Sequence, residues 1–244
     1  MKKLLLVIIA FASVYCATAQ KPSKEQKKKE WSKLTSRPGD HIMLQLSYDT
    51  WMGVPDSIKS HMTGFSRGFN AYVMIDKVFK RAPQFSVAIG AGISTNNMYF
   101  KNYEIDITSS TAKLPFNNLE NKDHFKKYKL AISYLEIPLE FRFSSNPAND
   151  TKSIKAAIGF KIGTLLNVHN KGKTYLDNNA RTIKTLTAKE TSNRYFNATH
   201  MAATARIGYG NFSIFGSYQL NNIFKDGVAA DMKILQIGLC ISGL

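Results

Sequence analysis

Residues 134–143 read Tyr-Leu-Glu-Ile-Pro-Leu-Glu-Phe-Arg-Phe, and apolar and polar side chains alternate along them with a period of two. Every odd-numbered position from 135 to 143 is apolar, whereas Glu136, Glu140 and Arg142 occupy even-numbered positions. Successive side chains of a β-strand point to opposite faces, so this pattern predicts a strand with one apolar and one polar face. The stretch therefore indicates a fold built from strands.

The same alternation recurs in seven other segments of similar length. A length of about ten residues is what a tilted strand needs to cross a bilayer. The second face of these segments carries Gly, Ala and Ser together with charges of both signs, which suits the crowded interior of a small barrel. We therefore expect an all-β fold, an eight-stranded antiparallel up-and-down transmembrane β-barrel with a lipid-facing apolar exterior and a filled lumen. The expected strands are 42–49, 69–76, 85–94, 135–143, 154–163, 201–209, 212–220 and 235–242.

The connections between these strands alternate in length. In outer-membrane barrels the short turns face the periplasm and the long loops face outward. The pattern therefore predicts both ends of the barrel domain on the periplasmic side. The short connections are 80–83, 144–151 and 210–211, and the long ones are about 51–64, 97–127, 168–194 and 221–232.

The first nineteen residues have the layout of a secretory signal peptide. Lys2 and Lys3 precede an apolar run, and Ala17-Thr18-Ala19 forms a small-x-small cleavage site. We expect cleavage after Ala19 and export to the outer membrane of a bacterial cell. Cys16 leaves a lipoprotein signal open as an alternative.

The expected domains are a signal peptide (1–19), a basic flexible periplasmic segment (20–38) and the outer-membrane barrel domain (39–244). The chain of 244 residues has a formal net charge of +16, which would suit a nucleic-acid partner. An exported chain has little access to nucleic acid, so we expect no such partner.

The segment 134–142 resembles the central strand motif of the PorT-like family of outer-membrane β-barrel proteins of Bacteroidetes. The signal ending in Ala19-Gln20 and the glycine-rich strand 88–93 are similar too. The resemblance covers about residues 40–244 and implies an eight-stranded barrel in the outer membrane. The family's named member assists the secretion of other proteins, so an accessory role in secretion across the outer membrane is one alternative.

Several charged residues of both signs lie on the polar strand faces. Charges taken out of water are tolerated when they are paired, so we expect an interior salt-bridge network. Asp49 fits either this interior or the barrel mouth. The residues of the expected network are Glu136, Glu140, Arg142, Lys155, Lys161 and Arg206.

The sequence offers no recognisable catalytic motif. Its five histidines are not spaced as metal ligands, and neither H-E-x-x-H nor G-x-S-x-G occurs. We therefore expect no catalytic, cofactor-binding or metal-binding residues and no cofactor. His200 is expected to pack on the lumen face. A membrane-embedded enzyme that modifies lipid or glycolipid stays an alternative, because its nucleophile and base need not be neighbours in sequence.

The long loops carry much of the excess positive charge. If they face outward they would meet the phosphates of surface glycolipid, and the alternative is a solvated surface. Lys126, Lys127 and Lys173 are our candidates for glycolipid contact. The basic residues are Lys101, Lys113, Lys122, Lys126, Lys127 and Lys129 in or next to the connection 97–127, and Lys171, Lys173, Arg181, Lys184, Lys189 and Arg194 in the connection 168–194.

These observations favour a non-enzymatic, monomeric outer-membrane barrel with a structural or surface-interaction role. Its partners would be outer-membrane lipid and anionic surface glycolipid, and the sequence identifies no protein partner. Three further classes stay open: the lipid-modifying enzyme, a pore, and a soluble eight-stranded barrel that carries a ligand in its interior.

Overall fold

A computed structural model of the chain describes residues 42–63 and 65–243, and the structural statements below concern these residues. The expected signal peptide with its cleavage after Ala19, and the expected basic segment 20–38, lie outside the described residues.

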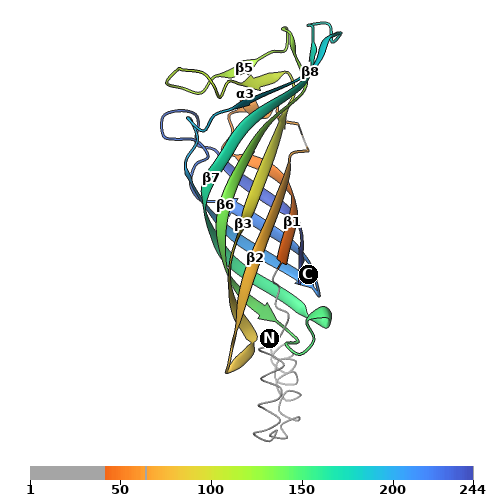
Figure 1. Cartoon of the computed structure of the whole chain (residues 1–244), viewed down its shortest axis with the longest axis vertical. Helices are drawn as coiled ribbons and strands as arrows, with labels where there is room; N and C mark the ends of the chain where they lie inside the picture. The colour runs from red at the N-terminus through yellow and green to blue at the C-terminus, as the bar shows by residue number, and fades with distance from the viewer. Residues whose placement is uncertain (1–41, 64, 244) are drawn as a thin grey trace, which may run out of the picture. The chain divides into compact units, whose positions relative to one another are not determined.

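Eight long strands form a closed antiparallel barrel (Figure 1). Each strand pairs with the next one along the barrel, the first and last strands pair with each other, and pairing of β6 with β7 completes the ring. The expected eight-stranded up-and-down barrel is thereby confirmed. The strands are β1 (Ile42–Met52), β2 (Arg67–Phe79), β3 (Ala82–Phe100), β6 (His124–Ser144), β7 (Ile154–Leu176), β9 (Thr199–Tyr209), β10 (Phe212–Gln219) and β11 (Lys233–Ser242).

The other elements lie in the connections between barrel strands. β8 (Thr182–Thr191) pairs with the last part of β7, and β4 (Tyr103–Ile105) pairs with β5 (Phe116–Asn118). The four-residue helix α3 (Asp56–Lys59) follows β1, and the short 3-10 helix η1 (Asp150–Lys152) lies in the β6–β7 turn. No helix in the described part of the chain has the length and apolar character of a membrane span. β4, β5, β8 and α3 all lie at the end of the barrel with the long connections (Figure 1).

The barrel turns its apolar strand faces outward. Val73, Ile158 and Leu239 each expose more than 60% of their surface, while polar side chains such as Asn70 and Gln236 are buried inside. A water-soluble barrel would bury the apolar face, because hydrocarbon surface is driven out of water. The expected lipid-facing exterior and filled lumen are therefore confirmed, and the large apolar side chains on the outside form what we call the apolar belt.

Three strands are about twice as long as the sequence predicted. β3, β6 and β7 have 19, 21 and 23 residues and continue beyond the apolar belt as an outer extension (Figure 1). The expectation that residues 97–127 and 168–194 form loops was therefore wrong in part, because bilayer thickness limits only the stretch inside the membrane. Five basic residues that were expected in loops therefore lie in β6 or β7: Lys126, Lys127, Lys129, Lys171 and Lys173.

The inner face of the outer extension packs against the long connections in an apolar core. Trp51 of β1, Phe100 of β3 and Phe224 of the last long connection meet there, with ring centroids of Trp51 5.7 and 5.8 Å from those of Phe100 and Phe224. We call this cluster the outer apolar core. Because its members come from β1, β3, β6, β7 and the connections, it ties the loops to the strands at the outer end of the barrel.

Candidate functional site

A row of five residues crosses the lumen wall at one level. Tyr72, Gly92, Glu136, Gly163 and His200 are successive cross-strand partners on β2, β3, β6, β7 and β9. A Cβ atom at Gly163 would lie 2.8 Å from Cγ of Glu136, and one at Gly92 would lie 2.6 Å from the ring of Tyr72. The two glycines therefore leave the space through which the larger side chains reach one another.

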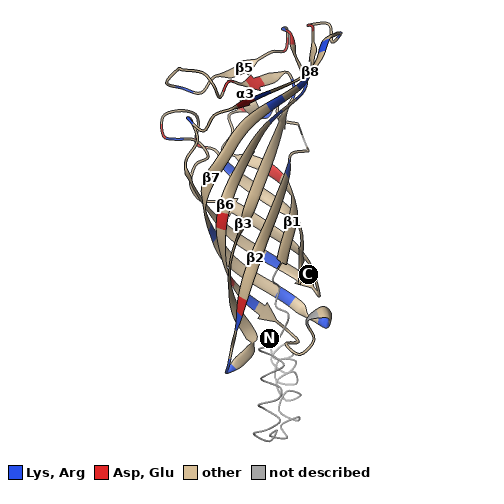
Figure 2. Cartoon of the chain, in the orientation of Figure 1, with Lys and Arg blue, Asp and Glu red and all other residues tan. Residues whose placement is uncertain are grey.

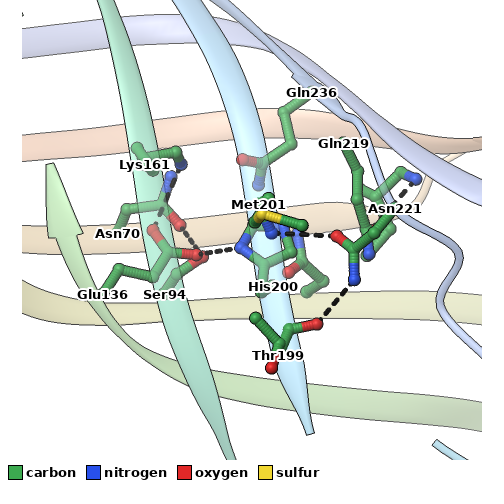
Figure 3. A network of polar contacts seen from close by, with 12 residues as sticks. Asn70, Ser94, Glu136, Lys161, Thr199, His200, Met201, Gln219, Asn221 and Gln236 are labelled. Atoms are coloured by element: carbon green, nitrogen blue, oxygen red, sulfur yellow. Dashed lines mark hydrogen bonds and ion pairs between the residues drawn. The ribbon is translucent and has the colours of Figure 1, made fainter. Parts of the chain in front are cut away.

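Glu136 is the centre of this row and is fully buried. The Tyr72 hydroxyl donates a hydrogen bond of 2.6 Å to its Oε2, and Nζ of Lys161 lies 3.3 Å from the same oxygen. Nδ1 of His200 lies 2.9 Å from Oε1, and the His200 ring stacks on Tyr134 at 4.4 Å between centroids. Figure 3 shows Lys161 and His200 approaching Glu136 from different strands. The carboxylate is thus surrounded by groups that compensate its charge.

Glu140 forms a second cluster four residues further along β6, on the same strand face. Its Oε2 lies 2.8 Å from Nε of Arg142 and 3.2 Å from Nη2 of Arg206. Arg142 and Arg206 flank Ala157 on the neighbouring strands, so a small residue again leaves room between two long side chains. Arg206 also donates from Nη1 to Oγ of Ser242 at 3.4 Å.

Asp49 forms a third cluster and lies inside the barrel, where it is 1% exposed. Its carboxylate accepts hydrogen bonds from Ser47, from Nδ2 of Asn96 at 2.8 Å and from Nε2 of Gln236 at 3.3 Å. The choice that the sequence left open between lumen and barrel mouth is settled in favour of the lumen.

The structure brings together five of the six residues of the expected network, in the two clusters around Glu136 and Glu140. Lys155, the sixth residue, lies near the start of β7, opposite Ser144 and Gly208, and is partly exposed. Sequence reasoning missed Tyr72 and His200 as partners of Glu136. Strand periodicity assigns both to the lumen face, but only the register between strands shows that they share a level with Glu136.

The lumen clusters resemble a catalytic site in composition but not in access. Glu136 is 0% exposed, and Tyr72, Lys161 and His200 all point at it. A general base must reach a substrate proton within hydrogen-bond distance, and here the protein's own groups occupy those positions. Among the described residues no three His, Cys, Asp or Glu side chains are grouped as metal ligands.

A second candidate site lies on the outward face of the outer extension. Lys127 and Lys129 of β6 are the direct cross-strand partners of Lys173 and Lys171 of β7. These two like-charged pairs border a cavity of about 240 Å³, which we call the basic pocket. Figure 2 shows the concentration of Lys and Arg near β8 at this end of the barrel. The pocket is lined by Arg67, Tyr99, Lys127, Tyr128, Lys129, Lys171 and Lys173.

A β-bulge turns the β7 lysines outward. Ser133 pairs with Asn167 and Tyr134 pairs with Leu165, so Leu166 is an extra residue in β7. An extra residue reverses which face the following side chains occupy. Without it, Lys171 and Lys173 would share the lumen face with Lys161.

The lining of the basic pocket contains cations and tyrosines but no carboxylate. Nζ of Lys129 donates to Oδ1 of Asn97 at 2.6 Å and lies 5.9 Å from the centroid of the Tyr99 ring. The Arg67 guanidinium lies 5.6 Å from the same centroid. Partial burial, and then the charges of Lys171, Arg67 and Lys173, lower the pKa of Lys129. The pocket is therefore a concentration of positive charge that its own side chains do not neutralise.

Of the three lysines that the sequence proposed for glycolipid contact, Lys127 and Lys173 line the basic pocket. Lys126 is exposed and does not line it. Sequence reasoning missed Arg67, Lys129 and Lys171. The alternation of inward Tyr128, Leu130 and Ile132 with Lys127 and Lys129 was the signal that could have placed the β6 lysines on one strand face.

Comparisons with known proteins give the class to which this fold belongs. Residues 41–225 match the model of the family described as outer membrane protein beta-barrel domain. The chain belongs to this family and is a small outer-membrane β-barrel. No curated protein matches it.

Among solved structures, the chain is similar to two crystal structures of Ail, the attachment invasion locus protein of Yersinia pestis. One of them is a complex with the heparin analogue sucrose octasulfate. In both cases the identity is 14%, with 82% of this chain and 94% of that chain covered, and the TM-scores are 0.34 for the complex and 0.35 for the other structure.

Proposed function

We propose that this protein is a non-enzymatic outer-membrane barrel that contacts anionic glycolipid of the surrounding outer leaflet through its basic pocket. The observation that carries the proposal is the position of the pocket, on the same strand faces as the apolar belt and directly beyond it. Membrane lipid is the surface that these faces meet, and cationic side chains beyond the hydrocarbon are attracted to anionic headgroups.

The distance from the belt to the pocket follows from the strands. On β2, exposed Phe69 belongs to the belt and Arg67 lies two residues before it on the same face, roughly 7 Å along the strand. On β6, Leu135 belongs to the belt and Lys129 lies six residues away on the same face, roughly 20 Å along a tilted strand. The cations therefore cover the height at which headgroup phosphates and sugars adjoin the hydrocarbon.

The absence of enzymatic activity is part of this proposal. The Glu136 and Glu140 clusters are the sites with the most acid–base chemistry among the described residues, and both are enclosed in the lumen wall by their own partners. The lumen clusters and the outer apolar core also fill the barrel at two levels, which favours a closed barrel over a pore. A planar bilayer containing the protein should show no single-channel conductance, and regular open-channel steps would favour the pore.

We further propose that residues 1–19 are a signal peptide, that residues 20–38 form a basic periplasmic segment, and that the protein is a monomer related to the PorT-like barrels. These features fit an exported barrel of this family. An accessory role in secretion is the second candidate function, and it is supported by the family resemblance alone.

A lipid-binding measurement tests the proposed function. The refolded protein is titrated with purified outer-leaflet glycolipid and, in parallel, with phosphatidylcholine. Neutralising Lys126, Lys127 and Lys173 to Gln should weaken glycolipid binding and leave phosphatidylcholine binding unchanged. The matched control neutralises Lys77, Lys80 and Lys152, three exposed lysines at the opposite end of the barrel. Equal glycolipid affinity of the first variant and the control would overturn the proposal.

A further inference from the structure

We infer that the basic pocket is a defined binding site for a phosphorylated sugar, with Arg67 and the Lys129–Lys171 pair as its phosphate ligands. This inference deepens the proposed function and rests on it, because it names the chemical group of the glycolipid that the pocket takes. The shared chemistry is a phosphate monoester on a sugar, whether it belongs to a lipid or is free.

The positive charges of the basic pocket are paired directly across neighbouring strands. Lys129 faces Lys171 directly, and the next pair on the same face is Lys127 with Lys173. Like charges directly opposite one another destabilise an antiparallel sheet. Lys189 of β8 lies opposite Lys171 on its other side, which extends the positive row to a third strand. A doubly charged oxyanion between the pairs would neutralise several of these cations at once.

Arg67 is oriented by two aromatic rings. Its guanidinium lies 5.0 Å from the centroid of Phe65 and 5.6 Å from the centroid of Tyr99. Contacts with two aromatic rings limit the orientations of the planar group. A guanidinium presents paired N–H donors that match the oxygens of a phosphate, and an oriented one loses less entropy on binding.

The size of the basic pocket suits a phosphorylated sugar. A volume of about 240 Å³ is that of roughly eight waters at about 30 Å³ each. A phosphate group has only five heavy atoms, so the cavity has room for a phosphate together with part of the sugar that carries it. The ring of Tyr99 forms part of the lining, between the charged groups of Arg67 and Lys129.

The pH dependence of binding separates phosphate from other anions. A phosphate monoester gains its second charge near pH 6, whereas carboxylates and sulfates are fully ionised above about pH 5. A site that uses the second charge should bind a phosphorylated sugar more tightly at about pH 7 than at about pH 5.5. Binding of a sugar carboxylate should not strengthen over that interval.

The experiment is calorimetric titration of the full barrel in detergent with glucose 1-phosphate, and separately with glucuronate. Arg67→Lys keeps the charge and removes the paired donors, and we expect at least about a tenfold loss of glucose 1-phosphate affinity. Lys129→Gln with Lys171→Gln should abolish measurable binding. The matched control is Lys101→Gln with Lys184→Gln, which removes the same charge outside the pocket lining. The heat-dependent gel shift of each variant shows that the barrel has folded.

The outcomes separate this inference from the proposed function. Equal binding of glucuronate and glucose 1-phosphate, or unchanged binding by both pocket variants, overturns the phosphate site. If glycolipid then still binds and the Lys126, Lys127 and Lys173 variant still weakens it, the proposed function stands without this site. If glucose 1-phosphate binds in the pocket but glycolipid does not, the proposed function fails and the ligand is a free phosphorylated sugar.

Discussion

Gly163 of β7 lies directly opposite Glu136 of β6, and a Cβ atom added at Gly163 would lie 2.8 Å from Cγ of Glu136. The glycine is therefore the space into which the glutamate side chain folds. Gly92 has the corresponding position on the other side of Glu136, beside the ring of Tyr72. Small residues in this lumen are thus complementary to particular large ones, and the buried charges depend on them.

Replacing Glu136 with Leu should destabilise the barrel. The change leaves the ammonium group of Lys161 buried without its carboxylate, and removal of one partner of a buried pair costs about 3–5 kcal/mol. The measurement is the midpoint of urea unfolding in detergent micelles. Ile137→Leu, at the neighbouring lipid-facing position, is the control and should unfold close to wild type. An unchanged midpoint for the Glu136 variant would contradict the role assigned to the pair.

The space at Gly163 can be tested by a double-mutant cycle. Gly163→Ala should destabilise the wild-type barrel more than it destabilises a Glu136→Ala background, because the added methyl group then no longer meets the glutamate chain. Residues in direct contact couple by about 0.5–3 kcal/mol. Unfolding free energies of the four proteins give the coupling. Strictly additive effects would show that the glycine serves only the close approach to the backbone oxygen of Leu135 at 2.7 Å.

Lys171→Thr should make the protein more stable while weakening anion binding. The substitution removes a charge that faces Lys129 on one side and Lys189 on the other. Relief of one opposed like-charge pair contributes about 0.2–1 kcal/mol. The gain should be seen in urea unfolding at low salt and should shrink in about 1 M salt, where the Debye length is about 3 Å. Lys184→Thr on β8 is the control, and a loss of stability in Lys171→Thr would refute the argument.

The outer β4–β5 pair should open more readily as the pH rises from about 4.5 to neutral. Burial, followed by the charges of Glu190 and Asp106, raises the pKa of Glu104 on β4 above its usual 4.5. A carboxyl with a raised pKa in the folded state stabilises below its unfolded pKa, and this contribution is lost as the pH rises through the folded-state pKa. Hydrogen exchange of the β4–β5 amides, corrected for intrinsic rates, measures the opening. Glu104→Gln should flatten the pH dependence, whereas Asp123→Asn at an exposed position should preserve it.

The sequence was sufficient for the eight strands and for the face of each residue within the membrane. Every membrane strand has one face in lipid, so the period-two pattern is strong there, as in residues 135–143. The same pattern continues through Tyr128, Leu130 and Ile132 and could have indicated that β6 runs on into the outer extension. Residues 95–100 of β3 and 168–176 of β7 carry no such regular alternation, so the length of these two strands could not be predicted.

Two features of the sites required the structure. The meeting of Tyr72 and His200 at Glu136 depends on the register across five strands, which is a long-range property of the closed barrel. The outward direction of Lys171 and Lys173 depends on one extra residue, Leu166, which has no signature in a strand of ordinary β-forming residues. Periodicity carried past that point assigns both lysines to the wrong face.

The unbroken course of β6 and β7 from the membrane into the outer extension fixes the height of the basic pocket relative to the apolar belt. A barrel positions itself in a bilayer by matching its belt to the hydrocarbon thickness, and bilayers differ in thickness by several ångströms. In a thicker outer membrane the pocket would sink toward the hydrocarbon, and in a thinner one it would rise above the headgroups. Occupancy of the pocket would then depend on the local thickness of the membrane, because the continuous strands fix the height of the pocket.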